Sequence, residues 1–112
     1  MKFTKSLKGN YLFRKTLKQG KYYKGKFITV HILKNNKSCN YLGICVSKKN
    51  GNSVIRNRLK RWVRESYKNI EDSLNIGYNI VVLYKKNVHG KDLEFSIIDK
   101  ELKEVLLKDN VK

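Results

Sequence analysis

The chain has 112 residues and a formal net charge of +17, because 26 Lys and Arg residues face only nine Asp and Glu residues. An apolar content of 40%, with seven Tyr and four Phe, is enough for a modest core and excludes an intrinsically disordered chain. No run approaches the roughly 20 apolar residues of a membrane helix, and residues 1–13 lack the continuous apolar region of a secretion signal. Without repeats or linkers, the sequence predicts one cytoplasmic domain over residues 1–112 and no membrane partner.

The distribution of charge along the chain is more informative than its sum. Residues 1–64 contain 18 Lys and Arg residues and no carboxylate, whereas residues 65–112 contain eight basic and nine acidic residues. Like charges held together in a fold repel one another, so this arrangement favours a polyanion that neutralises them. A nucleic acid is the partner that this composition predicts.

Cysteine and histidine are too sparse for a metal site in the sequence. Cys39 and Cys45 are six residues apart, and His31 and His89 are isolated from them and from each other. This spacing matches no zinc motif, so we expect no metal ligands on the protein. Two cysteines without a disulfide framework are typical of a reducing compartment.

Residues 6–19 predict a first helix, with Ser6 as its N-cap and Gly20 just past its end. Its apolar side carries Leu12, Phe13 and Leu17. Residues 21–26 follow as a basic, aromatic connector with the composition of a short edge strand around Tyr22 and Tyr23.

Three segments have the pattern of β-strands. Residues 27–33 alternate, with Ile28, Val30 and Ile32 on one face and Phe27, Thr29 and His31 on the other. Residues 41–47 also alternate, and the polar loop between the two segments predicts an antiparallel pair. Residues 79–84 are almost continuously apolar, which predicts a central strand.

A strongly basic helix is expected between the second and third of these strands. Asn50-Gly51-Asn52 is a turn sequence, and either Asn52 or Ser53 can cap the helix that follows. Its apolar stripe consists of Ile55, Leu59, Trp62 and Val63, and the pattern breaks at residues 75–77. We expect Trp62 to lie in the core.

A last helix is expected after Asp92, which can serve as its N-cap. Its apolar stripe consists of Phe95, Ile98, Leu102, Val105 and Leu106, and its acids alternate with lysines. The predicted order is therefore α-β-β-α-β-α, with one optional strand near residue 22. The fold class is α+β, a small mixed sheet with helices packed on it.

The exposed face of the basic helix is the candidate site. Arg56, Lys60 and Arg64 are spaced at i, i+4 and i+8, so their charges repel along one edge and lower helix stability. Their positions favour contact with phosphates, for which the guanidinium fork is well shaped. Asn57 is uncharged within this row, and the sequence leaves open whether it contacts RNA or bonds back to its own helix. The full candidate set is Lys48, Lys49, Arg56, Asn57, Arg58, Lys60, Arg61 and Arg64.

A longer motif surrounds these residues. Lys48-Lys49, Gly51-Asn52-Ser53-Val54, Arg56-Asn57-Arg58, Lys60-Arg61 and Arg64-Glu65 resemble, nearly position for position, the arginine-rich signature of the bacterial ribonuclease P protein subunit. The flanking strands, the Leu-rich last helix and the Phe13-Arg14-Lys15 segment follow in that family's order, so the resemblance covers essentially the whole chain.

The resemblance implies a fold and a function. It implies an α/β sandwich with a four-stranded sheet and a left-handed crossover around the basic helix, although right-handed crossovers are the general rule. It further implies binding to ribonuclease P RNA and to precursor tRNA, whose 5′ leader the RNA removes in a Mg-dependent hydrolysis. The Mg would be held mainly through the RNA, and the protein would supply no catalytic side chain.

The resemblance also implies a second binding region, a cleft between the first helix and the sheet that takes the single-stranded leader. Phe13 is carried over to that cleft, and Leu17 stands where relatives commonly have a second aromatic residue. From the residues themselves, Phe13 and Tyr11 are equally compatible with base stacking and with the core. Phe27 and His31 are further candidates for lining the same cleft.

Two other functions are compatible with parts of the sequence. A protein nuclease would need clustered carboxylates for metal-assisted cleavage, and residues 1–64 have none. A non-enzymatic RNA-binding module such as a ribosomal protein fits the composition equally well. The motif and its flanks are what favour the ribonuclease P subunit.

Overall fold

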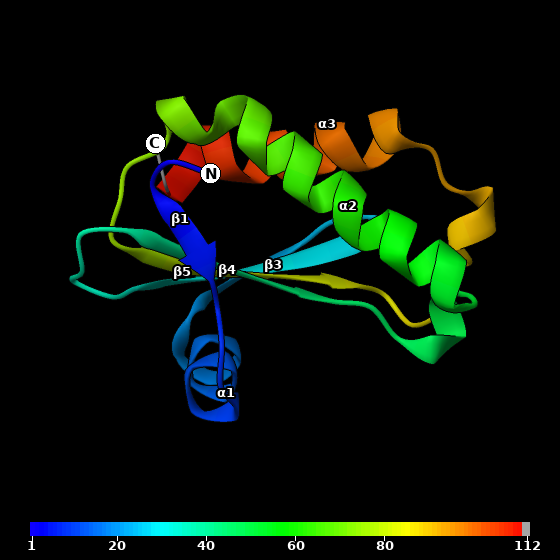
Figure 1. Ribbon diagram of the computed structural model, residues 1–112, viewed down its shortest axis with the longest axis horizontal. Helices are drawn as coiled ribbons and strands as arrows, with labels where there is room; N and C mark the ends of the chain where they lie inside the picture. The colour runs from blue at the N-terminus through cyan, green and yellow to red at the C-terminus, as the bar shows by residue number, and fades with distance from the viewer. Residues whose placement is uncertain (111–112) are drawn as a thin grey trace.

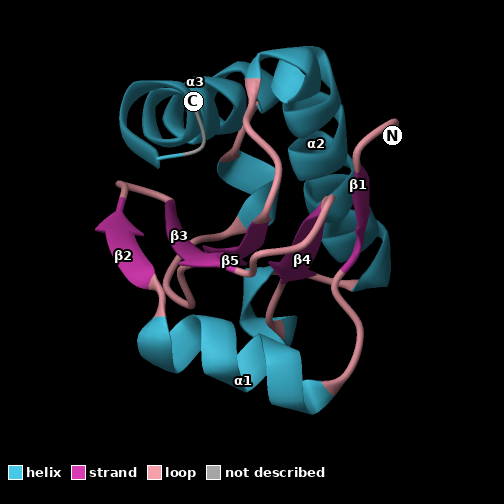
Figure 2. Ribbon diagram, turned by 90° about the vertical axis from the view of Figure 1, so that its left-hand side faces the viewer, coloured by secondary structure: helices cyan, strands magenta, loops and turns pink. Residues whose placement is uncertain are grey.

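The computed structural model describes the backbone of residues 1–110 and the side chains of residues 1–108. Its elements form three layers, with helix α1 (Asn10–Gln19) under a β-sheet and helices α2 (Ser53–Ile70) and α3 (Phe95–Val105) above it (Figures 1 and 2). The expected α/β sandwich is therefore confirmed.

The sheet has five strands, not four. From one edge to the other they are β1 (Thr4–Ser6), β4 (Asn40–Cys45), β5 (Tyr78–Tyr84), β3 (Ile28–Lys34) and β2 (Lys21–Lys24). The optional strand around Tyr22 is confirmed as β2. The unexpected strand is β1, whose three polar residues carry no alternating pattern by which it could be predicted.

The pairing of the two alternating segments was predicted wrongly. β3 and β4 run antiparallel but are not neighbours, because β5 lies between them, antiparallel to β3 and parallel to β4. Val81 and Val82 of β5 are both fully buried, so this strand is covered on both faces. A β3–β4 hairpin would close a shorter loop and lose less entropy, but placing β5 between the two strands buries more apolar surface, and this burial outweighs the entropy.

The connection from β4 through α2 to β5 joins two parallel neighbours. β4 and β5 run left to right in Figure 1, away from the viewer of Figure 2. In Figure 2 the chain rises from β4 into α2 and returns to β5 on the left of β4, which is the left-handed sense. The structure therefore agrees with the family expectation against the general preference.

Two helix boundaries differ from prediction. α1 starts at Asn10 instead of Ser6, because Thr4–Ser6 pairs with β4 and Gly9 turns the chain with φ 89°. α3 starts at Phe95, with Glu94 at its N-cap position, and Asp92 instead ends a short 3₁₀ turn, Gly90–Asp92. After α3 the chain continues as one wider turn over Leu106–Asn110.

The main core lies between the sheet and the upper helices. The predicted inner face of β3, Ile28, Val30 and Ile32, is buried there with residues of α2 and α3. The helices contribute Leu59, Val63, Tyr67, Ile70, Ile98, Leu102 and Leu106.

The lower face of the sheet is covered by α1 through a smaller, partly polar contact. Thr16 is fully buried, and its hydroxyl receives a hydrogen bond from the Asn79 side chain at 3.4 Å. Asn35 donates to the Asn79 side-chain oxygen at 2.9 Å. These bonds hold α1 against β5, the central strand. On either side of α1, part of the lower face of the sheet is left uncovered.

Candidate nucleic-acid interface

The start of α2 is set by its turn sequence. The Asn52 side chain accepts a hydrogen bond from the backbone N–H of Ile55 at 3.0 Å, so Asn52, of the two candidates, is the N-cap. Gly51 has φ 150°, and a Cβ there would lie 2.7 Å from Cγ2 of Ile55. Only glycine fits this position, so the conformation of the chain just before α2 is fixed.

Asn50 fixes the turn to the rest of the fold. Its side-chain amide donates to the carbonyls of Lys85 and Val88, each at 2.8 Å, and its oxygen accepts from the N–H of Ser47 at 2.9 Å. This buried side chain thereby holds the 3₁₀ turn Lys48–Asn50 in place. Lys48 and Lys49 remain exposed beside the N-terminus of α2, where the helix dipole also favours an anion.

The two sides of α2 differ completely. Leu59, Val63 and Tyr67 are fully buried against the sheet and α3. The basic side chains lie on the remaining surface, with Asn57, Arg61 and Arg64 exposed and Arg56, Arg58 and Lys60 half-buried. The residues that the sequence singled out on α2 therefore all reach one solvent-facing side of the helix.

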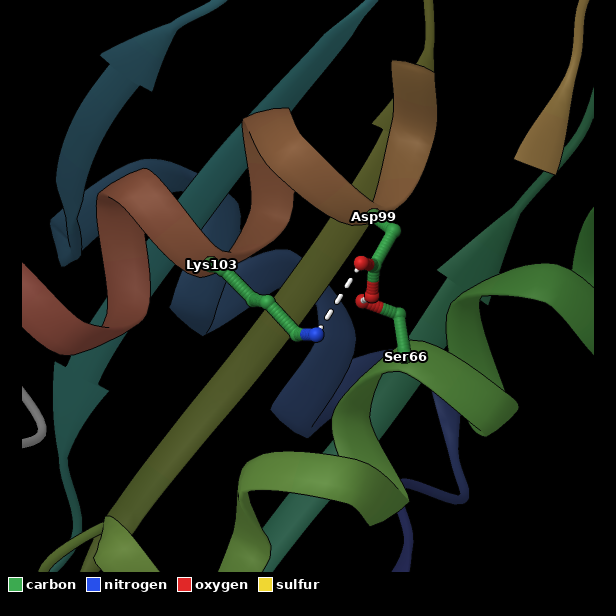
Figure 3. Close-up of polar contacts among 3 residues, drawn as sticks. All are labelled: Ser66, Asp99 and Lys103. Carbon is green, nitrogen blue, oxygen red and sulfur yellow. Dashed lines mark hydrogen bonds and ion pairs between the residues drawn. The ribbon is translucent and has the colours of Figure 1, made fainter. Parts of the chain in front are cut away.

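The acids of α3 do not neutralise this surface. Asp99 accepts a hydrogen bond from the Ser66 hydroxyl at 2.7 Å and pairs with Lys103 at 3.0 Å, so its partners are Ser66 and Lys103 (Figure 3). Among the described side chains, the ion pair that α2's basic residues make is Arg61–Glu65, at 3.9 Å and exposed on both sides. Such an exposed pair is weak, so the helix surface keeps nearly all its positive charge.

Trp62 was predicted to lie in the core but is only partly buried. Its ring meets Phe95 of α3 edge-on at 6.4 Å, and the guanidinium of Arg58 lies over its other side at 5.3 Å. Stacking holds Arg58 in a defined orientation, and its Nε and that of Arg56 are buried without a hydrogen-bond partner among the described atoms. Arg58 is therefore oriented by its stacking on Trp62 and not by a hydrogen bond of its Nε.

Phe13 and Leu17 lie together on one flank of α1. A Cβ added to Gly43 would be 3.4 Å from the Phe13 ring, so Phe13 lies over the middle of β4. The backbone of Leu17 hydrogen-bonds with His31 at the same level of the sheet. Both side chains are half-buried, which leaves an apolar edge open to solvent.

Beyond this edge the same face of the sheet is open. Thr29, Leu83 and Cys45 are register partners across β3, β5 and β4, two residues along each strand from His31, Val81 and Gly43. Side chains two residues apart point to the same face, so this row borders Phe13 and Leu17. All three residues are half-buried, and β4 leads from here directly to Lys48 and Lys49.

The structure does not bring all the leader-cleft candidates together. Tyr11 precedes Phe13 by two residues, or about 200° around the helix, and is 73% exposed on the opposite flank beside Lys15. Phe27 packs against the main core, and its N–H donates to Glu101 of α3. The helical phase of Tyr11 was visible in the sequence, whereas the position of Phe27 depends on α3.

His31 is buried beneath α1. Its ring lies 5.0 Å from that of Tyr22, and its Nδ1 has no hydrogen-bond partner among the described atoms. Burial lowers the pKa of this imidazole, against the opposing effect of its hydrogen bond with Leu17. His31 therefore supports α1 and is not open to a ligand.

The described residues contain no cluster of side chains that could hold a metal ion without other ligands. Among them, no group of three His, Cys, Asp or Glu side chains is close enough to hold a metal. Over the same residues, no helix has both the length and the apolar character needed to cross a bilayer.

The fold and the charged surface define a class: an α/β sandwich with a left-handed crossover whose connecting helix presents unneutralised arginines. The family model for ribonuclease P matches residues 1–109. The ribonuclease P protein component of Clostridioides difficile is 38% identical over 96% of this chain and 94% of its own length. The chain belongs to the ribonuclease P protein family.

Solved structures of relatives have the same fold. The RNase P protein from Thermotoga maritima matches with a TM-score of 0.82 at 28% identity, over 95% of this chain and 98% of that one. The Staphylococcus aureus RNase P protein matches with a TM-score of 0.75 at 33% identity, over 95% and 93% of the two chains.

Proposed function

We propose that this chain is the protein subunit of ribonuclease P, which binds the catalytic RNA subunit and the 5′ leader of precursor tRNA. It thereby assists RNA-catalysed removal of the leader in tRNA maturation in the cytoplasm. The observation that carries the proposal is the solvent-facing side of α2, where, among the described side chains, Glu65 is the one carboxylate that pairs with an arginine. In a member of this family, that surface is the docking face for the RNA.

The RNA-binding surface consists of α2 and the turn before it. Arg56, Arg58, Arg61 and Arg64 contact phosphates, with Lys60 adding charge between them. Lys48 and Lys49 extend the surface past the N-terminus of α2, where backbone N–H groups also face solvent. Asn57 is the uncharged member of the row, suited to a base edge or a 2′-hydroxyl.

The leader lies along the row Thr29, Leu83 and Cys45, beside Phe13 and Leu17. Phe13 stacks on an unpaired base, and Leu17 supplies apolar contact without stacking. This row ends beside Lys48 and Lys49, so one chain surface serves both the leader and the RNA subunit. Tyr11 and His31 have no part in it.

Mg²⁺ belongs to the RNA in this proposal, because the described side chains form no cluster that could hold a metal ion without other ligands. The protein's own residues bind and orient: the arginines of α2 neutralise phosphates that would otherwise repel one another in the assembled complex. Less Mg²⁺ is then needed to fold and load the RNA.

The test is reconstitution with the catalytic RNA and precursor tRNA at a Mg²⁺ concentration too low for the RNA alone. The proposal expects leader cleavage to rise on addition of the protein and none to occur with the protein alone. Binding to the RNA without any gain in cleavage would favour a non-enzymatic RNA-binding role. Cleavage by the purified chain without RNA would show that the catalytic groups are on the protein.

A further inference from the structure

Three hollows adjoin one another along the β1 edge and the flank of α1 that carries Tyr11. The first, of about 350 Å³, lies between β1, β4 and α2 and includes Lys60 and Arg64 in its lining. The second, of about 490 Å³, lies between the end of β1 and α1 and shares Lys5 and Ser6 with the first. The third, of about 180 Å³, lies between α1 and the β3–β4 loop. It shares Leu12 and Tyr41 with the second, so the three hollows are neighbours on the surface, and we call them together the β1 groove.

The lining of the β1 groove is basic throughout. It includes Lys5, Lys8, Lys15, Lys37, Lys60 and Arg64, and it contains no Asp or Glu in any of the three hollows. Short β1 also leaves the edge of β4 beyond Leu42 without a strand partner among the described residues, where Gly43 and Ile44 line the first hollow. This combination of charge and open backbone is complementary to a phosphodiester chain.

One tyrosine lines this path, and a second lies beside Lys15, which lines the third hollow. Tyr41 lines the second and third hollows, and the ammonium of Lys37 lies 5.6 Å from its ring centre. Tyr11 does not belong to the row beside Phe13. It lies next to Lys15 on the flank of α1 that faces the third hollow, and it is 73% exposed. Aromatic rings along a basic groove are the usual platform for unpaired bases.

We propose that the β1 groove binds a segment of single-stranded RNA, which runs from Lys60 and Arg64 on α2 around β1 to Tyr41. This inference depends on the proposed function in one respect: it takes the bound polyanion to be RNA. It adds a second single-strand path, which meets the Phe13 row at Gly43 in the first hollow and lies on the other flank of α1 in the second and third hollows. The RNA is single-stranded because its bases must be unpaired to stack on tyrosine.

Binding of a fluorescent oligouridine to the free protein tests the charge of the groove. The triple variant Lys5→Ala, Lys15→Ala, Lys37→Ala is compared with Lys91→Ala, Lys100→Ala, Lys108→Ala, which removes three exposed lysines outside the groove. Each lost phosphate contact to a single strand lowers the salt slope by about 0.7, so the groove variant should lose about two units. Equal slopes for the groove variant and its control would overturn the proposal.

Substitutions of Tyr41 test the stacking. Tyr41→Phe keeps the ring and should bind oligouridine as the wild type does, whereas Tyr41→Leu should bind about fivefold more weakly. Both variants remove the hydroxyl, so any disturbance of its contacts is common to them. Equal binding by the two variants would show that no base stacks at this position and would contradict the proposed path.

Cross-linking in the reconstituted holoenzyme identifies the strand. A photoreactive amino acid placed at Lys37, with Cys39 and Cys45 unchanged, should cross-link either to the leader or to an unpaired segment of the RNA subunit. Absence of cross-links to both RNAs would overturn the proposal in the holoenzyme. If oligouridine binds the groove but the protein does not stimulate cleavage, the proposed function is wrong, while the proposal that the groove binds single-stranded RNA is still supported.

Discussion

The hydroxyl of Tyr67 in α2 lies 2.7 Å from the hydroxyl of Thr4 in β1. Asn40 of β4 donates to the same Tyr67 oxygen at 3.2 Å, and the Thr4 hydroxyl also hydrogen-bonds with Glu71. The Glu71 carboxylate accepts the N–H groups of Lys2 and Phe3 at 2.9 and 3.1 Å. This network holds the short strand β1 to the end of α2, and β1 is the wall that shapes the first hollow of the groove.

Glu71→Gln is expected to release β1. Burial alone would raise the pKa of Glu71, but hydrogen bonds from Thr4, Lys2 and Phe3 and the nearby N-terminal charge lower it below 4.5. The native state then binds fewer protons than the unfolded state, so this stabilisation is complete above pH 4.5 and is lost as the pH falls through the lowered pKa. We expect Glu71→Gln to cost about 1–3 kcal/mol at neutral pH in urea denaturation.

The pH profile separates this role from a general loss of charge. Below pH 4.5 the wild type should lose stability more steeply than Glu71→Gln, because the variant has no carboxylate to protonate. Glu65→Gln, at an exposed site with one long ion pair, is the matched control and should remain within about 0.5 kcal/mol of the wild type. Parallel profiles for the wild type and Glu71→Gln would contradict the network.

His31 should make the fold sensitive to mildly acidic pH. Because burial lowers its pKa below 6.5, the unfolded chain binds a proton more readily than the native state. The contribution of His31 to the free energy of unfolding should therefore be greatest above pH 6.5 and should decrease as the pH falls toward the lowered pKa. An NMR titration of the imidazole measures this directly, and a midpoint at or above 6.5 would show that the ring is not desolvated beneath α1.

Asn50→Ala is expected to destabilise the entry to α2. The substitution leaves the carbonyls of Lys85 and Val88 without their side-chain donor, at a cost of about 1–3 kcal/mol. Affinity for the catalytic RNA should fall as well, because Lys48 and Lys49 lose their fixed positions. Asn69→Ala, exposed in the last turn of α2, is the control for both measurements, and an Asn50→Ala variant indistinguishable from it would contradict this role.

Leu17→Phe should strengthen contact with the leader. The new ring would lie one turn from Phe13 beside Thr29, Leu83 and Cys45, where a further base can stack. We expect leader-bearing precursor tRNA to bind the holoenzyme up to about fivefold more tightly, and Phe13→Ala to weaken it by a similar factor. Mature tRNA without a leader is the control substrate, and equal effects on both substrates would place these residues outside the leader path.

Elements with a strong local pattern could be predicted from the sequence. The period of the apolar residues identified α2, β3, β4 and β5, and the continuous run in β5 indicated its central place. The pairing of β3 with β5 instead of β4 depends on burial between distant segments, which no local pattern encodes. β1 has three polar residues, of which Thr4 pairs with Asn40 and hydrogen-bonds with Tyr67 and Glu71, so the existence of this strand depends on its folded neighbours.

The candidate site shows the same division. The basic side chains of α2 could be read from the sequence, because helix periodicity sets Asn57, Arg61 and Arg64 apart from Leu59 and Val63; their contact with RNA stays a prediction. The separation of Tyr11 from Phe13 also follows from the period of a helix and was overlooked. The row Thr29, Leu83 and Cys45 was not foreseen as a unit, because it needs the register of three strands that pair at long range.

The salt dependence of binding to the catalytic RNA tests the central claim, that the open side of α2 docks on RNA. Arg61→Ala is a suitable probe, since its side chain is exposed, has only the weak exposed pair with Glu65 and, unlike Arg58, stacks on nothing among the described residues. We predict weaker binding and a salt slope smaller by about one, with Lys100→Ala on α3 unchanged. An Arg61→Ala variant that binds with the wild-type affinity and slope would contradict the account.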